Sequence, residues 1–103
     1  MTDLGLHKTD IAAINSVFQN YSQIESVILY GSRAKNTFRD GSDIDLTIVG
    51  EKVTLNKLFE IEQDLDDLLL PWKIDLSLFH QIENEELIDH IKRIGIVFYT
   101  KLK

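Results

Sequence analysis

The sequence predicts an α/β (α+β) two-layer sandwich, in which helices cover mainly one face of a mixed four-stranded sheet. The first observation is that segments with helical spacing alternate with short β-rich runs, in the order α-β-(short α)-β-α-β-α-β. The second is that 103 residues leave room for a single hydrophobic core. The third is a composition of 44% hydrophobic and 27% charged residues, which is typical of a folded domain. We therefore expect one domain over residues 1–103.

The first elements are an amphipathic helix and a buried strand. Apolar residues recur at helical spacing over residues 8–21, and Thr9 is a candidate N-cap. The β-branched and aromatic run at 26–30 predicts a buried strand. Residues 32–36 fit one helical turn, and residues 37–42 predict a loop.

The remaining elements continue the alternation between strand and helix. In order they are a strand at 43–49, a helix from Thr54 to Pro71, a strand at 73–79, a helix from Asn84 to Gly95 and a strand at 96–99. Thr54 and Asn84 are good N-caps, because their side-chain oxygens accept hydrogen bonds from the first turn. Pro71 ends its helix, and Gly95 stands where a C-terminal cap belongs.

The alternation within two strands predicts that three aspartates converge. Side chains two positions apart on a strand share a face, so Asp43 and Asp45 point the same way, opposite Ile44. Asp75 stands opposite Ile74 in the later strand. If the apolar faces of both strands cover the helices and the strands are neighbours, all three carboxylates meet within metal-bridging distance on the open face.

Such carboxylates have a clear chemical use. Three of them held together repel one another unless a cation lies between them, and aspartate oxygens select hard ions such as Mg²⁺ or Mn²⁺. Two such ions, about 3.5–4 Å apart, can activate an attacking hydroxyl and neutralise a leaving pyrophosphate. Taken alone, the acids at 43 and 45 are better explained as part of a capped turn entering a strand. Because Asp75 is expected on the same face of the sheet, a metal-dependent transfer site is the better interpretation.

A phosphate-binding turn precedes these acids. Gly31 lets the backbone approach a phosphate closely, and Ser32 offers both its N–H and its hydroxyl. Arg33 can add charge-assisted hydrogen bonds to a triphosphate. Lys35 and Arg39 fit a solvated loop as well as a phosphate contact. Together with the acids, this turn predicts a nucleotidyl-transfer site.

The motifs together resemble those of the nucleotidyltransferase superfamily that includes DNA polymerase beta, and most closely its minimal MNT-type branch. The resemblance rests on Gly31-Ser32, ten intervening residues, Asp43-Ile44-Asp45-Leu46, Lys73-Ile74-Asp75-Leu76 and the closing run at 94–99. It implies a palm-like nucleotidyltransferase fold that binds Mg²⁺ (or Mn²⁺) and uses ATP as the nucleotide donor.

The resemblance also implies a role for each motif residue. Gly31 and Ser32 would bind the β- and γ-phosphates, and Asp43 and Asp45 would hold both metals. Asp75 would complete the catalytic metal site and help to deprotonate the acceptor hydroxyl.

The resemblance further implies a protein partner. Members of this branch are typically encoded beside a HEPN-domain protein, with which they form a toxin–antitoxin pair. An MntA-like antitoxin of this kind would transfer AMP from ATP to a tyrosine of the HEPN toxin. Because the sequence indicates no pocket for the group that accepts AMP, we expect the partner, a second copy of the chain, or both to complete the site. Asn36 departs from the glycine of many relatives, although asparagine tolerates the same left-handed backbone.

Two alternatives belong to other functional classes. One is a non-catalytic antitoxin that neutralises its partner by binding alone. Three converging acids argue against it, because a protein that only binds does not need them. The other is an adenylyltransferase for a small molecule such as an aminoglycoside, which the lack of a second domain disfavours.

Composition limits the remaining functions. A net charge of −6, from 17 acids and 11 bases, argues against strong direct binding of nucleic acid. No apolar run approaches the roughly 20 residues needed to cross a bilayer, and no secretion signal is visible, so we expect a cytoplasmic protein.

The three histidines show no spacing typical of metal ligands, so we expect surface or core positions for His7, His80 and His90. The acids at 60–67 predict a solvated helix face, with a docking surface for a basic partner as the alternative.

Overall fold

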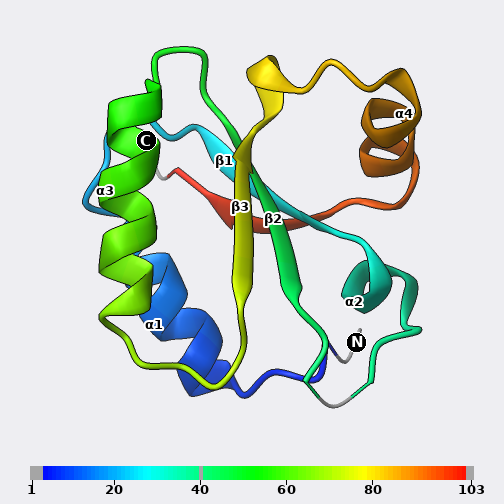
Figure 1. Ribbon diagram of the computed structural model, residues 1–103. Coiled ribbons are helices and arrows are strands. Elements are labelled where there is room, and N and C mark those ends of the chain that lie inside the picture. The colour runs from blue at the N-terminus through cyan, green and yellow to red at the C-terminus, as the bar shows by residue number, and fades with distance from the viewer. Residues whose placement is uncertain (1–3, 40, 102–103) are drawn as a thin grey trace.

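The computed structural model describes residues 4–39 and 41–101, and its elements follow the expected order. They are α1 (Lys8–Phe18), β1 (Ser26–Tyr30), α2 (Ser32–Lys35), β2 (Ile44–Val49), α3 (Leu55–Asp66), β3 (Ile74–Leu78), the 3₁₀ turn η1 (Phe79–Gln81), α4 (Glu85–Ile94) and β4 (Ile96–Thr100) (Figure 1). The 3₁₀ turn after β3 is the element that the sequence did not predict. The mixed sandwich is confirmed.

The four strands form one mixed sheet in the order β3-β2-β1-β4. β1 is antiparallel to both β2 and β4, whereas β2 and β3 run parallel. In the parallel pair Asp45 lies beside Asp75, and in the antiparallel pair Tyr30 lies beside Asp45. Three neighbouring strands therefore each bring one polar or aromatic side chain to the same row of the sheet.

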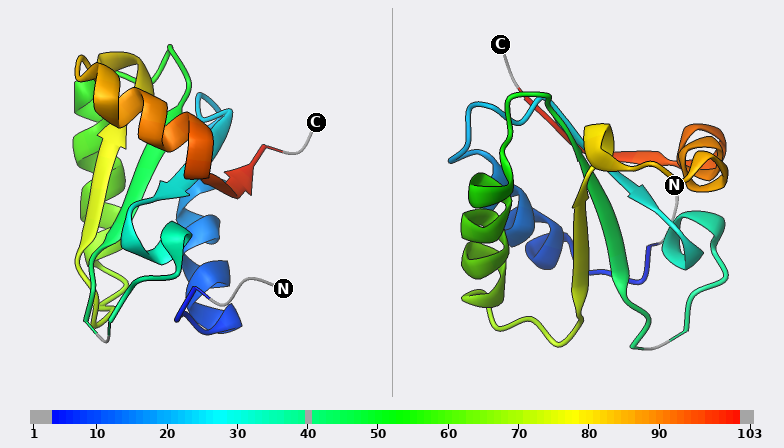
Figure 2. Two further views of the ribbon diagram at one scale, coloured as in Figure 1. Left: turned by 90° about the vertical axis from the view of Figure 1, so that its right-hand side faces the viewer. Right: turned by 45° about the horizontal axis from the view of Figure 1, so that its top comes forward.

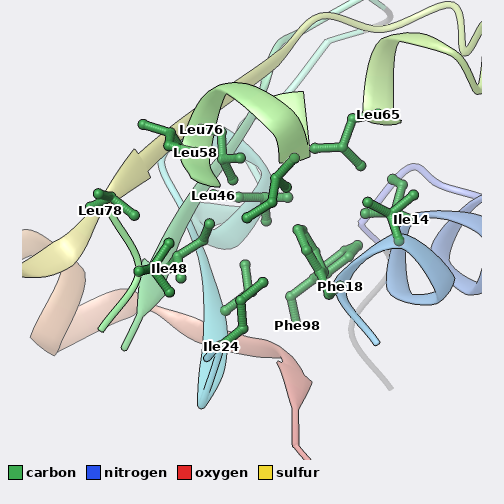
Figure 3. Packing of buried hydrophobic residues seen from close by; sticks show 14 of the residues in the cluster. Ile14, Phe18, Ile24, Leu46, Ile48, Leu58, Leu65, Leu76, Leu78 and Phe98 are labelled. Carbon is green, nitrogen blue, oxygen red and sulfur yellow. The ribbon is translucent and has the colours of Figure 1, made fainter. Parts of the chain in front are cut away.

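Helices α1 and α3 lie on one side of the sheet, and α2 and α4 lie on the other (Figures 1 and 2). The main core fills the space between the sheet and helices α1 and α3, where Leu46 of β2 belongs to one cluster with Ile14, Phe18 and Leu65 (Figure 3). Leu46 and its β2 neighbours on that face are fully buried, which directs the alternate residues of β2 to the opposite face. The expected phase of this strand is confirmed.

Local chemistry sets the helix ends. Thr54 and Asn84 each accept a hydrogen bond from the backbone N–H three residues ahead, at 3.2 and 3.1 Å, as expected for N-caps. The cap expected at Thr9 is wrong, because α1 begins at residue 8 and His7 is its N-cap. There the Asp10 carboxylate accepts the His7 N–H at 3.3 Å, which satisfies one of the free donors at the helix start.

Helix α4 packs closely against β1 at its C-terminal end. Gly95 follows the helix with φ −59° and ψ 144°, which is an extended conformation and not the left-handed cap that glycine often forms. A Cβ at this position would overlap the Ile91 carbonyl oxygen and approach the Ile28 side chain of β1. Glycine therefore permits the close contact that holds α4 beside the open face of the sheet.

Candidate active site

Two aspartates stand side by side on neighbouring strands. Asp45 and Asp75 are register partners in the parallel β2–β3 pair, whose strands lie about 4.8 Å apart in any regular sheet. Asp43 comes immediately before β2, two residues from Asp45. Asp43 and Asp75 are exposed, while Asp45 is partly buried. The sheet therefore brings the predicted acids to one edge of its open face.

The fold raises the pKa of Asp45. Burial raises its pKa, and the negative charges of Asp75 and Asp43 raise it further. The Arg33 guanidinium acts in the opposite direction, as the His90 ring does when protonated, without cancelling the rise. The site therefore holds more negative charge than its own cations neutralise.

These residues fit a hard divalent cation by donor type and by charge. Carboxylate oxygens are the ligands that Mg²⁺ and Mn²⁺ prefer, and a cation beside Asp45 would relieve the repulsion that raises its pKa. Within residues 4–39 and 41–101, no three histidine or acidic side chains already form a metal-binding group. The metal role of Asp43, Asp45 and Asp75 therefore stays a prediction that rests on chemistry and on the register of the strands.

Gly31 lies in direct contact with the acid of the middle strand. It follows β1 and caps α2 with φ +78° and ψ −153°, a conformation that favours glycine. The Asp45 carboxylate occupies the space that a Cβ at this position would fill. Ser32 begins α2 directly after this turn and is partly buried. The predicted phosphate turn and the predicted metal ligands are thus adjacent.

A layer of hydroxyl groups lies on the same face of the sheet. Ser77 of β3 donates a hydrogen bond to the fully buried Thr47 Oγ1 at 2.9 Å. Burial raises the pKa of Tyr30, as do the charges of Asp45 and Asp75, while a hydrogen bond with Ser77 opposes the rise. These hydroxyls lie on the same face as the carboxylates and bond to one another; strand alternation predicts the face but not the hydrogen bonds.

Arg33, for which the sequence predicts a contact with a triphosphate, has a buried side chain. It is 1% exposed, and its Nη1 and Nη2 atoms donate to the carbonyl oxygens of Leu4 and Ser42 at 2.7 and 2.8 Å. The guanidinium also lies 5.1 Å from the ring of Phe38 and 5.7 Å from that of Trp72. In this position it joins the N-terminal segment to the loop before β2, and its contact with a triphosphate stays a prediction.

One residue of the site was missed. The Nε2 atom of His90, on α4, accepts a hydrogen bond from the Gly31 N–H at 3.2 Å. The two residues are 59 positions apart, so no local spacing in the sequence indicates their contact. Lys35 and Arg39 are exposed, and Asn36 adopts the expected left-handed conformation with φ 62°.

No helix in the described ranges has both the length and the apolar character needed to span a bilayer.

Sequence comparison gives the chain clear relatives. The family described as "Polymerase beta, Nucleotidyltransferase" matches residues 12–103. MntA of Haemophilus influenzae, a probable protein adenylyltransferase, is 27% identical over 104 residues, which cover 97% of this chain and 88% of that protein. Three Methanocaldococcus jannaschii relatives, also named as protein adenylyltransferases, are matched over 62% to 63% of their own length.

Solved structures give the same picture at the level of the fold. A toxin–antitoxin complex with AMP-PNP is similar with a TM-score of 0.70 and 20% identity, over 93% of this chain and 75% of that chain. A complex of tri-AMPylated Shewanella oneidensis HEPN toxin with MNT antitoxin gives a TM-score of 0.68 and 16% identity, over 93% and 74%. At these identities the likeness establishes a shared fold.

The raised pKa of Asp45 predicts a variant that is more stable than the natural protein. An acid whose pKa is raised by folding binds its proton more tightly in the folded state, so stability falls as the pH rises from the unfolded pKa through the folded one. In EDTA, we expect Asp45→Asn to have a higher Tm than the natural chain at pH 7, with the difference vanishing towards pH 3. Thermal denaturation followed by circular dichroism across this range measures it.

The matched control is Asp89→Asn, since Asp89 is exposed and makes a surface ion pair with Arg93. Its Tm should change little at any pH. A lower Tm for Asp45→Asn at pH 7, or a difference that does not depend on pH, would contradict this account of the site.

The position of Arg33 predicts a structural effect. Replacing it with methionine leaves two partly buried carbonyl oxygens without their charged donor, which costs about 2–4 kcal/mol of the free energy of unfolding. Lys35→Met, on the exposed side of the same turn, should change it by less than about 0.5 kcal/mol. Urea denaturation measures both, and equal stabilities for the two variants would show that the guanidinium is not a structural anchor.

Proposed function

The chain belongs to the polymerase beta-like nucleotidyltransferase family, and from this premise we propose that it transfers AMP from ATP to a hydroxyl of a partner protein. The observation that carries the proposal is the pairing of Asp45 with Asp75 beside the Gly31 turn. It combines acids suited to a divalent ion with an adjacent glycine turn of the kind that suits phosphate, and phosphoryl transfer needs both.

The motif residues divide the tasks of this reaction among them, and Asp75 has two. Asp43, Asp45 and Asp75 supply the oxygen ligands for Mg²⁺ or Mn²⁺, which, when bound, polarises the α-phosphate and offsets the charge of the leaving pyrophosphate. Gly31 and Ser32 bind the β- and γ-phosphates through the close approach of their backbone. Asp75 also takes the proton of the acceptor hydroxyl, and its exposure supports this role.

The bonds of the step balance without any further reagent. The acceptor oxygen bonds to the α-phosphorus of ATP as the bond from that phosphorus to the bridging oxygen of the β-phosphate breaks. The acceptor proton passes to the Asp75 carboxylate, and pyrophosphate leaves with the electron pair of the broken bond. Most of the rate enhancement comes from the positioning of charges, because the protein forms no covalent bond with the nucleotide.

We place the acceptor on a HEPN-type toxin, and specifically on a tyrosine hydroxyl. Two similarities support this choice: the relative MntA is a probable protein adenylyltransferase, and a protein of the same fold was solved with a tri-AMPylated HEPN toxin. The exposure of Asp43 and Asp75 supports it further, since a side chain of another protein can reach them. The chain then acts as the antitoxin of the pair.

The test combines the purified chain with the HEPN-type protein encoded beside its gene, MgCl₂ and ATP labelled at the α-phosphate. We expect label on the partner, none when γ-labelled ATP is used, and none after EDTA treatment. Asp43→Asn and Asp75→Asn should each lower the rate by about 100-fold or more, because a metal ligand supplies several kcal/mol of transition-state stabilisation. Mass spectrometry of the labelled peptide identifies the acceptor residue.

Asp66→Asn, a change of the same kind, should leave the rate within about twofold, since this acid is exposed and belongs to α3, the helix on the far side of the sheet (Figure 1). If the partner is neutralised without label, and Asp43→Asn neutralises it equally well, the chain acts by binding alone. Label on an added aminoglycoside but not on the partner would instead identify a small-molecule adenylyltransferase.

A further inference from the structure

Helix α4 contributes His90 to the site, beside the predicted phosphate turn. Its Nε2 atom accepts the Gly31 N–H at 3.2 Å, and its ring meets the Tyr30 ring edge-on, with centroids 6.2 Å apart and an interplanar angle of 82°. Accepting a hydrogen bond at Nε2 requires the neutral ring with its proton on Nδ1. The side chain is thus held by two contacts with consecutive residues of one strand end.

The hydrogen bond satisfies a donor that regular structure leaves free. Gly31 follows the last residue of β1 and precedes the first residue of α2, so neither element provides a partner for its N–H. A partly buried N–H without an acceptor is costly, and the peptide would turn to find one. His90 therefore fixes the orientation of this peptide plane.

The orientation of Gly31 also sets the separation of the turn from the carboxylates. The Asp45 side chain fills the space beside the Gly31 Cα, so a rotation of this peptide would change the contact between the two residues. In the proposed reaction the same two groups hold opposite ends of one ligand, namely its phosphates and its metal. A small misplacement of one relative to the other weakens binding steeply.

We propose that His90 is a positioning residue for the nucleotide: by holding the Gly31 N–H, it keeps the Gly31-Ser32 turn at the distance from Asp45 at which a nucleoside triphosphate binds. The inference rests on the proposed function and adds to it a residue from the last helix. His90 touches neither the phosphates nor the metal in this account, and it acts only through the backbone of Gly31.

A purely structural role is the competing explanation, and the packing of α4 makes the two separable. Ile91 is 2% exposed and anchors α4, and the contact of Gly95 with Ile28 closes the same interface. These contacts attach α4 to the sheet without using the hydrogen bond of His90. A variant that lacks the hydrogen-bond acceptor but keeps the ring volume should fold normally and lose only the position of the turn.

The experiment compares His90→Phe, which cannot accept the hydrogen bond, with His90→Gln, whose amide oxygen can. His80→Phe, at an exposed site in η1, is the matched control. For His90→Phe we expect the dissociation constant and KM for Mg·ATP to rise about tenfold, which corresponds to about 1.4 kcal/mol, with kcat within about threefold. His90→Gln should regain most of the affinity, and the Tm of all three variants should stay close to that of the natural chain.

Isothermal titration calorimetry gives the affinities, and amide hydrogen exchange of Gly31 reports its hydrogen bond without nucleotide. Unchanged ATP affinity in His90→Phe, while the natural chain binds ATP, overturns this inference and leaves the proposed function standing. Equal loss of affinity in the Phe and Gln variants, accompanied by a lower Tm, shows a structural role and overturns it as well. A natural chain that binds no Mg·ATP removes the proposed function, and this inference falls with it.

Discussion

The in-register parallel pairing of β2 with β3 is the constraint on which the rest of the structure depends. It places Asp45 directly beside Asp75, and a slip of one residue would turn one of the two carboxylates into the core. The register is fixed from the opposite face, where Leu46, Leu76 and their neighbours are buried against the helices. Packing on the apolar face of the sheet thus sets the positions of the two carboxylates on the opposite face.

This arrangement concentrates negative charge around Asp45, and the surrounding structure offsets part of it. Burial and two neighbouring acids raise the pKa of Asp45, and nearby positive charge offsets only part of this effect. Arg33 contributes such a charge from a buried position, where its hydrogen bonds hold the loop that leads into β2. The fold therefore keeps a local instability at the site and balances it with a large continuous core on the other side of the sheet.

Strand alternation and helix caps were enough to predict most of the fold and the meeting of Asp45 with Asp75, because both signals are local in the sequence. The roles of Arg33 and His90 could not be predicted in this way. Their hydrogen bonds join residues as far as 29 and 59 positions apart, and such contacts exist only once the helices are packed on the sheet. A charged residue next to a phosphate turn suggested a ligand contact for Arg33, whereas the aromatic rings around it form a buried site for its guanidinium.

The central claim is that the open edge of the β2–β3 pair is a divalent-metal site. Anomalous diffraction from crystals grown with Mn²⁺ and a non-hydrolysable ATP analogue tests it most directly, since the scattering locates the ion independently of any assay. The account predicts an anomalous peak at about 2.0–2.2 Å from carboxylate oxygens of Asp43 and Asp45, with Asp75 beside it and the phosphates at the Gly31 turn. An ordered nucleotide with no manganese at these aspartates, or with manganese bound elsewhere, would contradict it.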